Sequence, residues 1–182
     1  MPGIKIRAAR EQDTEAIAHL YVYTWRTTYA GLLPDHVLIG MKPERFMFFF
    51  ARALKHRSEN ILVCEDNTNT IVAMGSAGVN RDRGSKFAGE VYTLYVSPDH
   101  QNTGIGERML AKLFQILARD GCSSAVVWVL ALNPSRFFYE AVGGSLVGDR
   151  DEQLWGTTLK EFGYGWDDLS AAITNGRPRL QD

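Results

Sequence analysis

A glycine-containing loop followed by a helix is the feature of this sequence best suited to hold a ligand. It reads Gln101-Asn102-Thr103-Gly104-Ile105-Gly106 and follows a β-rich run that ends near Val96. The first amides of a helix lack intrahelical acceptors, and the helix dipole favours negative charge there. Glycine lets a backbone approach phosphate oxygens, but a tight turn also needs glycine for conformational reasons alone. The loop therefore indicates a phosphate site if other features agree.

Two common phosphate-binding loops are excluded by their residue types. A Walker loop has Gly-Lys-Ser/Thr where this chain has Gly106-Glu107-Arg108. A dinucleotide-binding loop has a third small residue where Met109 stands, and no acidic residue ends the next strand. A dinucleotide oxidoreductase is further disfavoured because the chain begins with antiparallel rather than repeating βαβ patterns. A third kind of phosphate loop remains.

Hydrophobic periodicity predicts the elements that position this loop. Alternating or continuous apolar runs predict strands at 4–8, 61–65, 71–79, 90–96 and 124–132. Helical spacing and capping residues predict helices at 14–28, 35–56 with an interruption at Lys42-Pro43, 105–121 and 133–143. A final pair of strands is expected at 145–147 and 152–159. The tail, 167–182, is expected to be loose because its end is polar.

Size and composition favour one cytoplasmic domain. The 182 residues, 45% of them hydrophobic, suffice for one core. Lys and Arg number 20 against 21 Asp and Glu, which leaves no field for nucleic acid or a membrane surface, and no run is long enough to cross a bilayer. Cys64 and Cys122 lie in or beside apolar runs and are expected to be buried thiols. The four histidines lack metal-ligand spacing, so no metal site is predicted.

Several features together resemble the GNAT family of N-acetyltransferases. Gln-x-x-Gly-x-Gly after Leu-Tyr-Val is similar to that family's acetyl-CoA motif, and Asn133 and Tyr139 fall where the family has a pantetheine-binding Asn and a leaving-group Tyr. The element order from Ile4 to about Phe162 also matches. The resemblance implies an α+β fold over residues 1–166, with a mostly antiparallel central sheet of six to seven strands flanked by about four helices.

The resemblance implies a binding site for acetyl-CoA as cosubstrate. Backbone groups of Leu94-Tyr95-Val96 would pair with the pantetheine arm like an added strand. Amides of residues 101–106 would hold the pyrophosphate. Asn133 would hydrogen-bond the pantetheine, a role compatible with capping the helix that follows it. Arg108, one turn into its helix, would reach a phosphate or else be a solvated surface residue.

The resemblance also suggests how the chemistry would be divided. An alkylammonium, with a pKa of about 10, must lose a proton before it attacks a thioester. Glu90 is the predicted general base, directly or through water, or else a solvated carboxylate at a strand end. Period-two geometry puts Glu90 on the side of Tyr92 and Leu94 unless a bulge intervenes. Tyr139 would protonate the departing thiolate, or else serve packing alone. An amide near Leu94 or Tyr95 would stabilise the oxyanion.

Neither cysteine is placed to form an acyl-enzyme, so direct transfer in a ternary complex is expected. Trp25 and Tyr29 lie one helical turn apart and would form a wall of the acceptor site, or else belong to the core. The predicted acceptor is a primary amine of a small molecule. A protein N-terminus or lysine, and an inactive CoA-binding module, are the alternatives. A homodimer is compatible with this interpretation.

Overall fold

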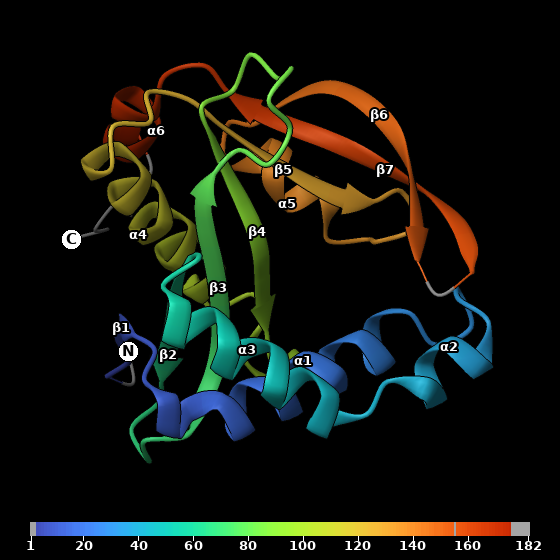
Figure 1. The fold of residues 1–182 in the computed structure, drawn as a ribbon. Coiled ribbons are helices and arrows are strands. Elements are labelled where there is room, and N and C mark those ends of the chain that lie inside the picture. Colours follow the sequence, from blue (N-terminus) through green and yellow to red (C-terminus); the bar gives the residue numbers. More distant parts are fainter. Residues whose placement is uncertain (1–2, 155, 176–182) are drawn as a thin grey trace.

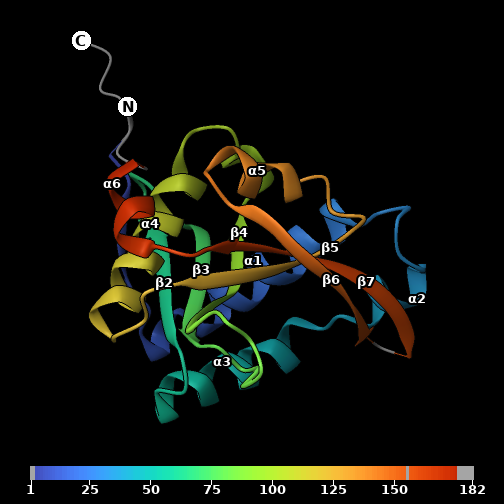
Figure 2. The same ribbon diagram turned by 90° about the horizontal axis from the view of Figure 1, so that it is seen from above.

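The computed structural model describes residues 3–154 and 156–175, and its centre is a mixed sheet with helices on both faces (Figure 1; Figure 2). The strands are β1 (Lys5–Ala8), β2 (Asn60–Glu65), β3 (Ile71–Val79), β4 (Gly89–Val96), β5 (Ala125–Leu130), β6 (Ser145–Leu154) and β7 (Thr157–Trp166). Their order is β1-β2-β3-β4-β5-β7-β6, and only β4 and β5 are parallel neighbours. This confirms the predicted α+β class.

Six α-helices accompany the sheet in the described part of the chain. They are α1 (Thr14–Thr28), α2 (Asp35–Gly40), α3 (Pro43–His56), α4 (Ile105–Arg119), α5 (Arg136–Ala141) and α6 (Leu169–Asn175). Helix α4 packs on one face of β2, β3 and β4, whereas α1 packs on the other face and α3 against α1. The apolar stripe of α4 is the reason: Met109, Leu113 and Leu117 are completely buried. No helix in the described ranges is long and apolar enough to span a membrane.

Strand β4 contains a bulge that changes which side its residues face. The register between β3 and β4 shifts after Ser76, so that Tyr92 is an extra residue on β4. Val91 and Leu94 therefore both pack toward α4, although they are three residues apart. Glu90 faces the opposite side and cannot share a face with Leu94. From the sequence, Glu90 was expected on the side of Leu94 only if no bulge intervened, and the bulge at Tyr92 breaks that condition.

Beyond the bulge, β4 and β5 separate. They pair only where Gly89–Val91 meets Ala125–Val127. The far half of β4, Leu94 to Val96, pairs with β3 on one edge and has no partner strand on the edge that faces β5, within the residues that the structure describes. Figure 1 shows the two strands diverging. An open wedge with free main-chain groups results.

The C-terminal third differs most from expectation. The predicted strand at 152–159 straddles the turn between β6 and β7, and both strands are ten residues long. The segment Asp149 to Glu152 looks like a loop in sequence because it is polar on both faces. The tail expected from residue 167 instead forms α6, where Leu169 is buried against the core. Residues 176–182 lie outside the described part.

Both cysteines are free and buried, as predicted. Burial raises the pKa of the Cys64 thiol and of the Cys122 thiol above their ordinary values. A buried thiol with a raised pKa holds little thiolate and is a poor nucleophile. The surroundings of both side chains therefore suit packing rather than acyl transfer.

Gly144 lies at the closest approach between the end of α5 and β7. A Cβ added there would lie 2.8 Å from the carbonyl oxygen of Tyr139 and 2.7 Å from Cζ2 of Trp166. We expect Gly144→Ala to lower the free energy of unfolding by about 1–3 kcal/mol, because the backbone must shift. Urea unfolding monitored by circular dichroism measures it.

Gly40 provides the matched control, because it ends α2 in open space with an ordinary backbone conformation. Gly40→Ala should leave the free energy of unfolding unchanged or slightly raised. Equal effects at the two positions would contradict the close packing of α5 on β7.

Candidate active site

A groove of about 840 Å³ follows the open wedge from the far half of β4 to the start of α4. Its walls come from α1, β4, the loop before α4, and the segment that leads into α5. The lining residues are Thr24, Thr28, Tyr29, Leu94, Tyr95, Val96, Gln101, Asn102, Gly104, Gly106, Glu107, Asn133, Pro134, Ser135, Phe137, Phe138, Tyr139, Ala141 and Val142. Most of the predicted coenzyme-binding positions are thus gathered along one groove.

The loop before α4 presents unpaired amides. Gly104 has φ +81° and Asn102 φ +60°, left-handed conformations that turn the chain into the helix. Of the amides in residues 101–106, that of Gln101 donates to the Pro98 carbonyl at 3.3 Å, and the other five have no acceptor in the described chain. Free amides at the positive end of a fifteen-residue helix suit a phosphate group.

Further polar groups along the groove lack partners. The edge of Leu94-Tyr95-Val96 that faces β5 carries main-chain donors and acceptors without a partner strand, although the Val96 carbonyl accepts a hydrogen bond from the Gln101 side chain at 3.1 Å. Thr24 is 4% exposed, and its hydroxyl has no hydrogen-bond partner among the described residues. A buried polar group without a partner is costly, so a ligand with amide groups would relieve the cost. The groove therefore fits a pantetheine arm followed by a diphosphate.

Asn133 stands at the inner end of the groove but does not cap α5. Its amide nitrogen donates to the Tyr29 hydroxyl at 2.9 Å, and its side-chain oxygen accepts the Ser135 amide at 2.8 Å. The helix begins at Arg136 with Ser135 as the N-cap residue, so the predicted cap, Asn133, is two residues too early. Asn133 instead belongs to a turn that crosses from β5 to α5.

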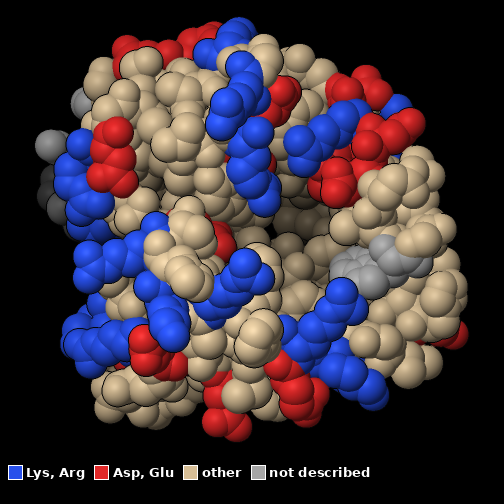
Figure 3. Space-filling model, viewed as in Figure 1, with Lys and Arg blue, Asp and Glu red and all other residues tan. Residues whose placement is uncertain are grey.

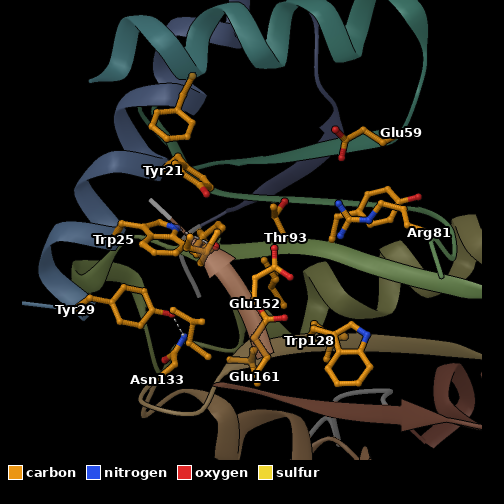
Figure 4. A pocket seen from close by; sticks show the side chains of 18 of the residues that line it. Tyr21, Trp25, Tyr29, Glu59, Arg81, Thr93, Trp128, Asn133, Glu152 and Glu161 are labelled. Atoms are coloured by element: carbon orange, nitrogen blue, oxygen red, sulfur yellow. Dashed lines mark hydrogen bonds between the residues drawn. The ribbon is translucent and has the colours of Figure 1, made fainter. Parts of the chain in front are cut away.

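A second cavity of about 360 Å³ lies between β4 and the β6–β7 ribbon, and its mouth is the hollow in Figure 3. One wall is aromatic: Tyr21, Trp25 and Tyr29 line it (Figure 4). Phe46 also belongs to the lining. The rings of Trp25 and Tyr29 lie 4.7 Å apart, and the Trp25 indole donates to the Tyr95 hydroxyl at 3.0 Å. Both residues are buried, so they serve the core and the cavity wall together.

Charged side chains occupy the rest of this cavity. Those in its lining are Glu59, Arg81, Arg150, Glu152 and Glu161. Figure 4 shows Glu152 and Glu161 near the centre, Glu59 and Arg81 on one side, and the aromatic residues on the other. Arg150 donates from Nε to Glu161 Oε2 at 2.8 Å and its guanidinium lies 4.3 Å from the Trp128 ring centroid. Three carboxylates face two guanidinium groups, so the lining favours a cation.

The groove and the cavity meet, because five residues line both. These are Tyr29, Leu94, Tyr95, Asn133 and Tyr139. Tyr139 is 6% exposed, and no described residue hydrogen-bonds to its hydroxyl. Burial raises the pKa of Tyr139, so the phenol is protonated at neutral pH and available as a donor. A chemical group held at this junction would be within reach of ligands in both the groove and the cavity.

Glu90 lies outside both linings. It is 2% exposed, and its carboxylate accepts hydrogen bonds from the Arg81 amide at 3.1 Å, Nε at 3.2 Å and Nη2 at 2.7 Å. The Arg81 guanidinium also lies 4.2 Å from the Tyr92 ring centroid, and the Tyr92 hydroxyl donates to the Val79 carbonyl at 2.6 Å. This network fixes the bulge and the loop that follows β3.

Three predicted coenzyme-binding side chains lie outside the groove lining. Ile105 is buried in the core, Arg108 is exposed beyond the first turn of α4, and Thr103 bonds back to the His100 carbonyl at 2.6 Å. Five charged residues of the cavity were not predicted from the sequence: Glu59, Arg81, Arg150, Glu152 and Glu161. The polar segment from Asp149 to Glu152 carries no strand signal of its own, and only the pairing of β6 with β7 places Arg150, Glu152 and Glu161 on one face.

The comparisons with known proteins agree with this geometry. A model of the acetyltransferase (GNAT) family matches residues 11–143. An uncharacterized N-acetyltransferase from Bacillus subtilis (strain 168), YuaI, is 34% identical over 172 residues, which cover 94% of this chain and 97% of the relative.

Solved structures share the fold at lower identity. The PaiA N-acetyltransferase from Thermoplasma acidophilum, in complex with coenzyme A, has a TM-score of 0.71 and 18% identity, covering 90% of this chain and 99% of that chain. The putative acetyltransferase yncA from Salmonella typhimurium, with acetyl-CoA, has a TM-score of 0.68 and 20% identity, covering 92% and 94%. Since the family model spans most of the sequence and the Bacillus relative nearly all of it, the chain belongs to the acetyltransferase (GNAT) family and is an acetyl-CoA-dependent acyltransferase.

Proposed function

We propose that the protein transfers an acetyl group from acetyl-CoA to a primary amine of a small molecule, by direct attack within a ternary complex. The observation that carries the proposal is the junction of the groove with the cavity at Tyr29, Tyr95, Asn133 and Tyr139. A donor in the groove and an acceptor in the cavity would meet there, as direct transfer requires.

The groove residues fit the coenzyme in sequence along its length. Free amides of residues 102–106 would bind the diphosphate, and the open edge of Leu94-Tyr95-Val96 would pair with the pantetheine. The hydroxyl of Thr24 and the amide of Asn133 would hold its amide groups. When bound, acetyl-CoA supplies an acetyl group activated as a thioester. Two solved structures with this fold were determined with coenzyme A or acetyl-CoA, which supports the assignment.

The cavity supports a small amine as the acceptor. Its volume of about 360 Å³ lies near the lower end of the about 300–1,000 Å³ usual for ligand pockets. Trp25 and Tyr21 offer ring faces to a cation, and the surplus of carboxylates favours an ammonium group. A peptide substrate would leave most of its length outside such a space.

Acetyl transfer itself is assigned to Tyr139 and to main-chain groups of β4. Tyr139 would give its proton to the sulfur that leaves, since its hydroxyl is buried at the junction and free of other partners. An amide in the unpaired stretch of Leu94-Tyr95 would stabilise the negative charge on the carbonyl oxygen. Neither buried cysteine lines the junction.

Thiol release from acetyl-CoA tests the proposed function directly. A panel of alkylamines, aromatic amines, amino acids, aminoglycoside antibiotics and N-terminal peptides should show turnover with small cationic amines. Preference for peptides would support a protein acetyltransferase instead. Coenzyme binding by calorimetry without turnover of any amine would indicate an inactive binding module.

Replacing Tyr139 by Phe should lower kcat by about 10²-fold or more, because the leaving sulfur loses its proton donor. The dissociation constant of coenzyme A should stay the same, since the ring is retained. Stopped-flow or steady-state thiol release gives kcat, and calorimetry gives the constant. Full turnover in this variant would limit Tyr139 to packing.

Gly104→Ala should weaken coenzyme A binding at least about tenfold, because a methyl group would alter the left-handed loop and enter the space in front of the free amides. Calorimetry measures the loss.

Gly121→Ala is the matched control, since Gly121 has φ +90° just beyond the other end of α4 and also faces open space. Both variants should lose similar stability, about 1–2 kcal/mol, for the same conformational reason. If binding fell equally in both, the loop before α4 would not be the phosphate site.

A further inference from the structure

We propose that Glu161, on β7, is the general base that removes the proton from the acceptor ammonium, and that Glu90 acts only as a positioning residue. This inference rests on the proposed function. It is independent of the family resemblance, which points to the acidic residue on β4.

The position of Glu161 follows from strand register. It pairs with Leu130 of β5 on one side and with Arg150 of β6 on the other. Leu130 faces the cavity, and its carbonyl accepts a hydrogen bond from the main-chain amide of Asn133 at 2.8 Å. This hydrogen bond begins the turn toward the junction. A residue opposite Leu130 therefore lies beside the turn that carries Asn133. Glu161 is the cavity carboxylate that the sheet brings closest to the reacting centre.

The other two cavity carboxylates lie farther out. Glu152 pairs with Leu159, two positions nearer the β6–β7 turn than the pair of Arg150 and Glu161. Glu59 precedes β2 and is on the opposite side of the cavity, near Arg81 (Figure 4). Neither has the direct register contact with β5 that Glu161 has.

The carboxylate of Glu161 has one oxygen free to accept the proton of the acceptor ammonium. Arg150 holds Oε2, whereas Oε1 has no hydrogen-bond partner among the described residues. The side chain is 12% exposed and lines the cavity. Glu90 contrasts with it, because Arg81 donates to both of its oxygens and it lines neither space.

The surrounding charges suit a base that works near neutral pH. Burial raises the pKa of Glu161 above the ordinary glutamate value, Arg150 opposes this rise, and the charges of Glu152 and Glu90 add to it. From α1 and β4, the hydroxyls of Tyr29 and Tyr95 face the same region, and burial, with a smaller contribution from Glu161, raises the pKa of both, that of Tyr95 to about 12. The neighbouring ion pairs of Lys160 with Asp149 and Asp151 lie on the other face of the ribbon.

Glu161 takes one proton from the ammonium, which frees the nitrogen lone pair, and later returns it to solvent. The bond from nitrogen to the acetyl carbon forms as the bond from that carbon to sulfur breaks. Tyr139 gives its proton to the sulfur, and the second nitrogen proton restores the Tyr139 hydroxyl.

The first test is the dependence of kcat on pH, with saturating acetyl-CoA and the fastest amine of the panel. Wild-type kcat should fall at low pH as Glu161 is protonated. Glu161→Gln should lower kcat about 10²-fold or more and abolish this acidic limb. Glu161→Asp should retain the limb at reduced kcat. Glu90→Gln should keep the limb, moved only slightly to lower pH because the charge of Glu90 is lost, whatever its effect on the height of the profile.

Variants of the two arginine partners distinguish Glu161 from Glu90 as the general base. Arg150→Met removes a group that lowers the pKa of Glu161, so the limb should move to higher pH. Arg81→Met, the comparison variant, should move the limb much less than Arg150→Met does, because Arg81 bonds to Glu90 and Arg150 bonds directly to Glu161. If the limb followed Arg81 or disappeared in Glu90→Gln, Glu90 would be the base and the inference would be overturned.

A measurement without activity completes the test. Carbon-13 titration of the Glu161 carboxyl in the ligand-free protein should show a pKa above about 4.3, the ordinary value, and a further rise in Arg150→Met. Titration in the ordinary range would overturn the inference. If wild type turned over no amine at all, the proposed function would fail, whereas an active enzyme with an intact limb in Glu161→Gln would refute Glu161 alone.

Discussion

The separation of β4 from β5 is the constraint on which the site depends. Strands in a sheet normally satisfy both of their edges, and leaving one open exposes main-chain donors and acceptors. Here the pairing stops at Val91 because Tyr92 is an extra residue, and the far half of β4 keeps only β3 as a neighbour. The wedge that results admits a ligand between two strands of one continuous sheet.

The bulge is held in place by an ion pair between the buried Glu90 carboxylate and the largely exposed Arg81, and by a cation–π contact. Glu90 binds the main chain and side chain of Arg81, and Arg81 covers the Tyr92 ring. Removing Arg81 would be costly, because the buried Glu90 carboxylate would be left without its charged partner. An acidic residue at this point in β4 therefore has a structural reason to be present, separate from any role in proton transfer.

The parts of the site that depend on local sequence were predictable. Gly104 and the apolar stripe of α4 fix the loop and helix, and the resemblance supplied Asn133 and Tyr139. The facing of Glu90 was not predictable, because it depends on a bulge that neighbouring strands decide. Glu161 was missed for a related reason: its surroundings come from Leu130 and Arg150, which only the register of β5, β6 and β7 brings to it.

The hydrogen bond from Asn133 to Tyr29 spans the boundary between the groove and the cavity. A ligand in the groove that replaces the Tyr29 hydroxyl as the acceptor of this N–H would release that hydroxyl to the cavity. Occupancy of the two spaces would then be energetically linked, and such linkage is reciprocal. The coenzyme and the acceptor would thus each alter the affinity for the other through a single exchanged contact.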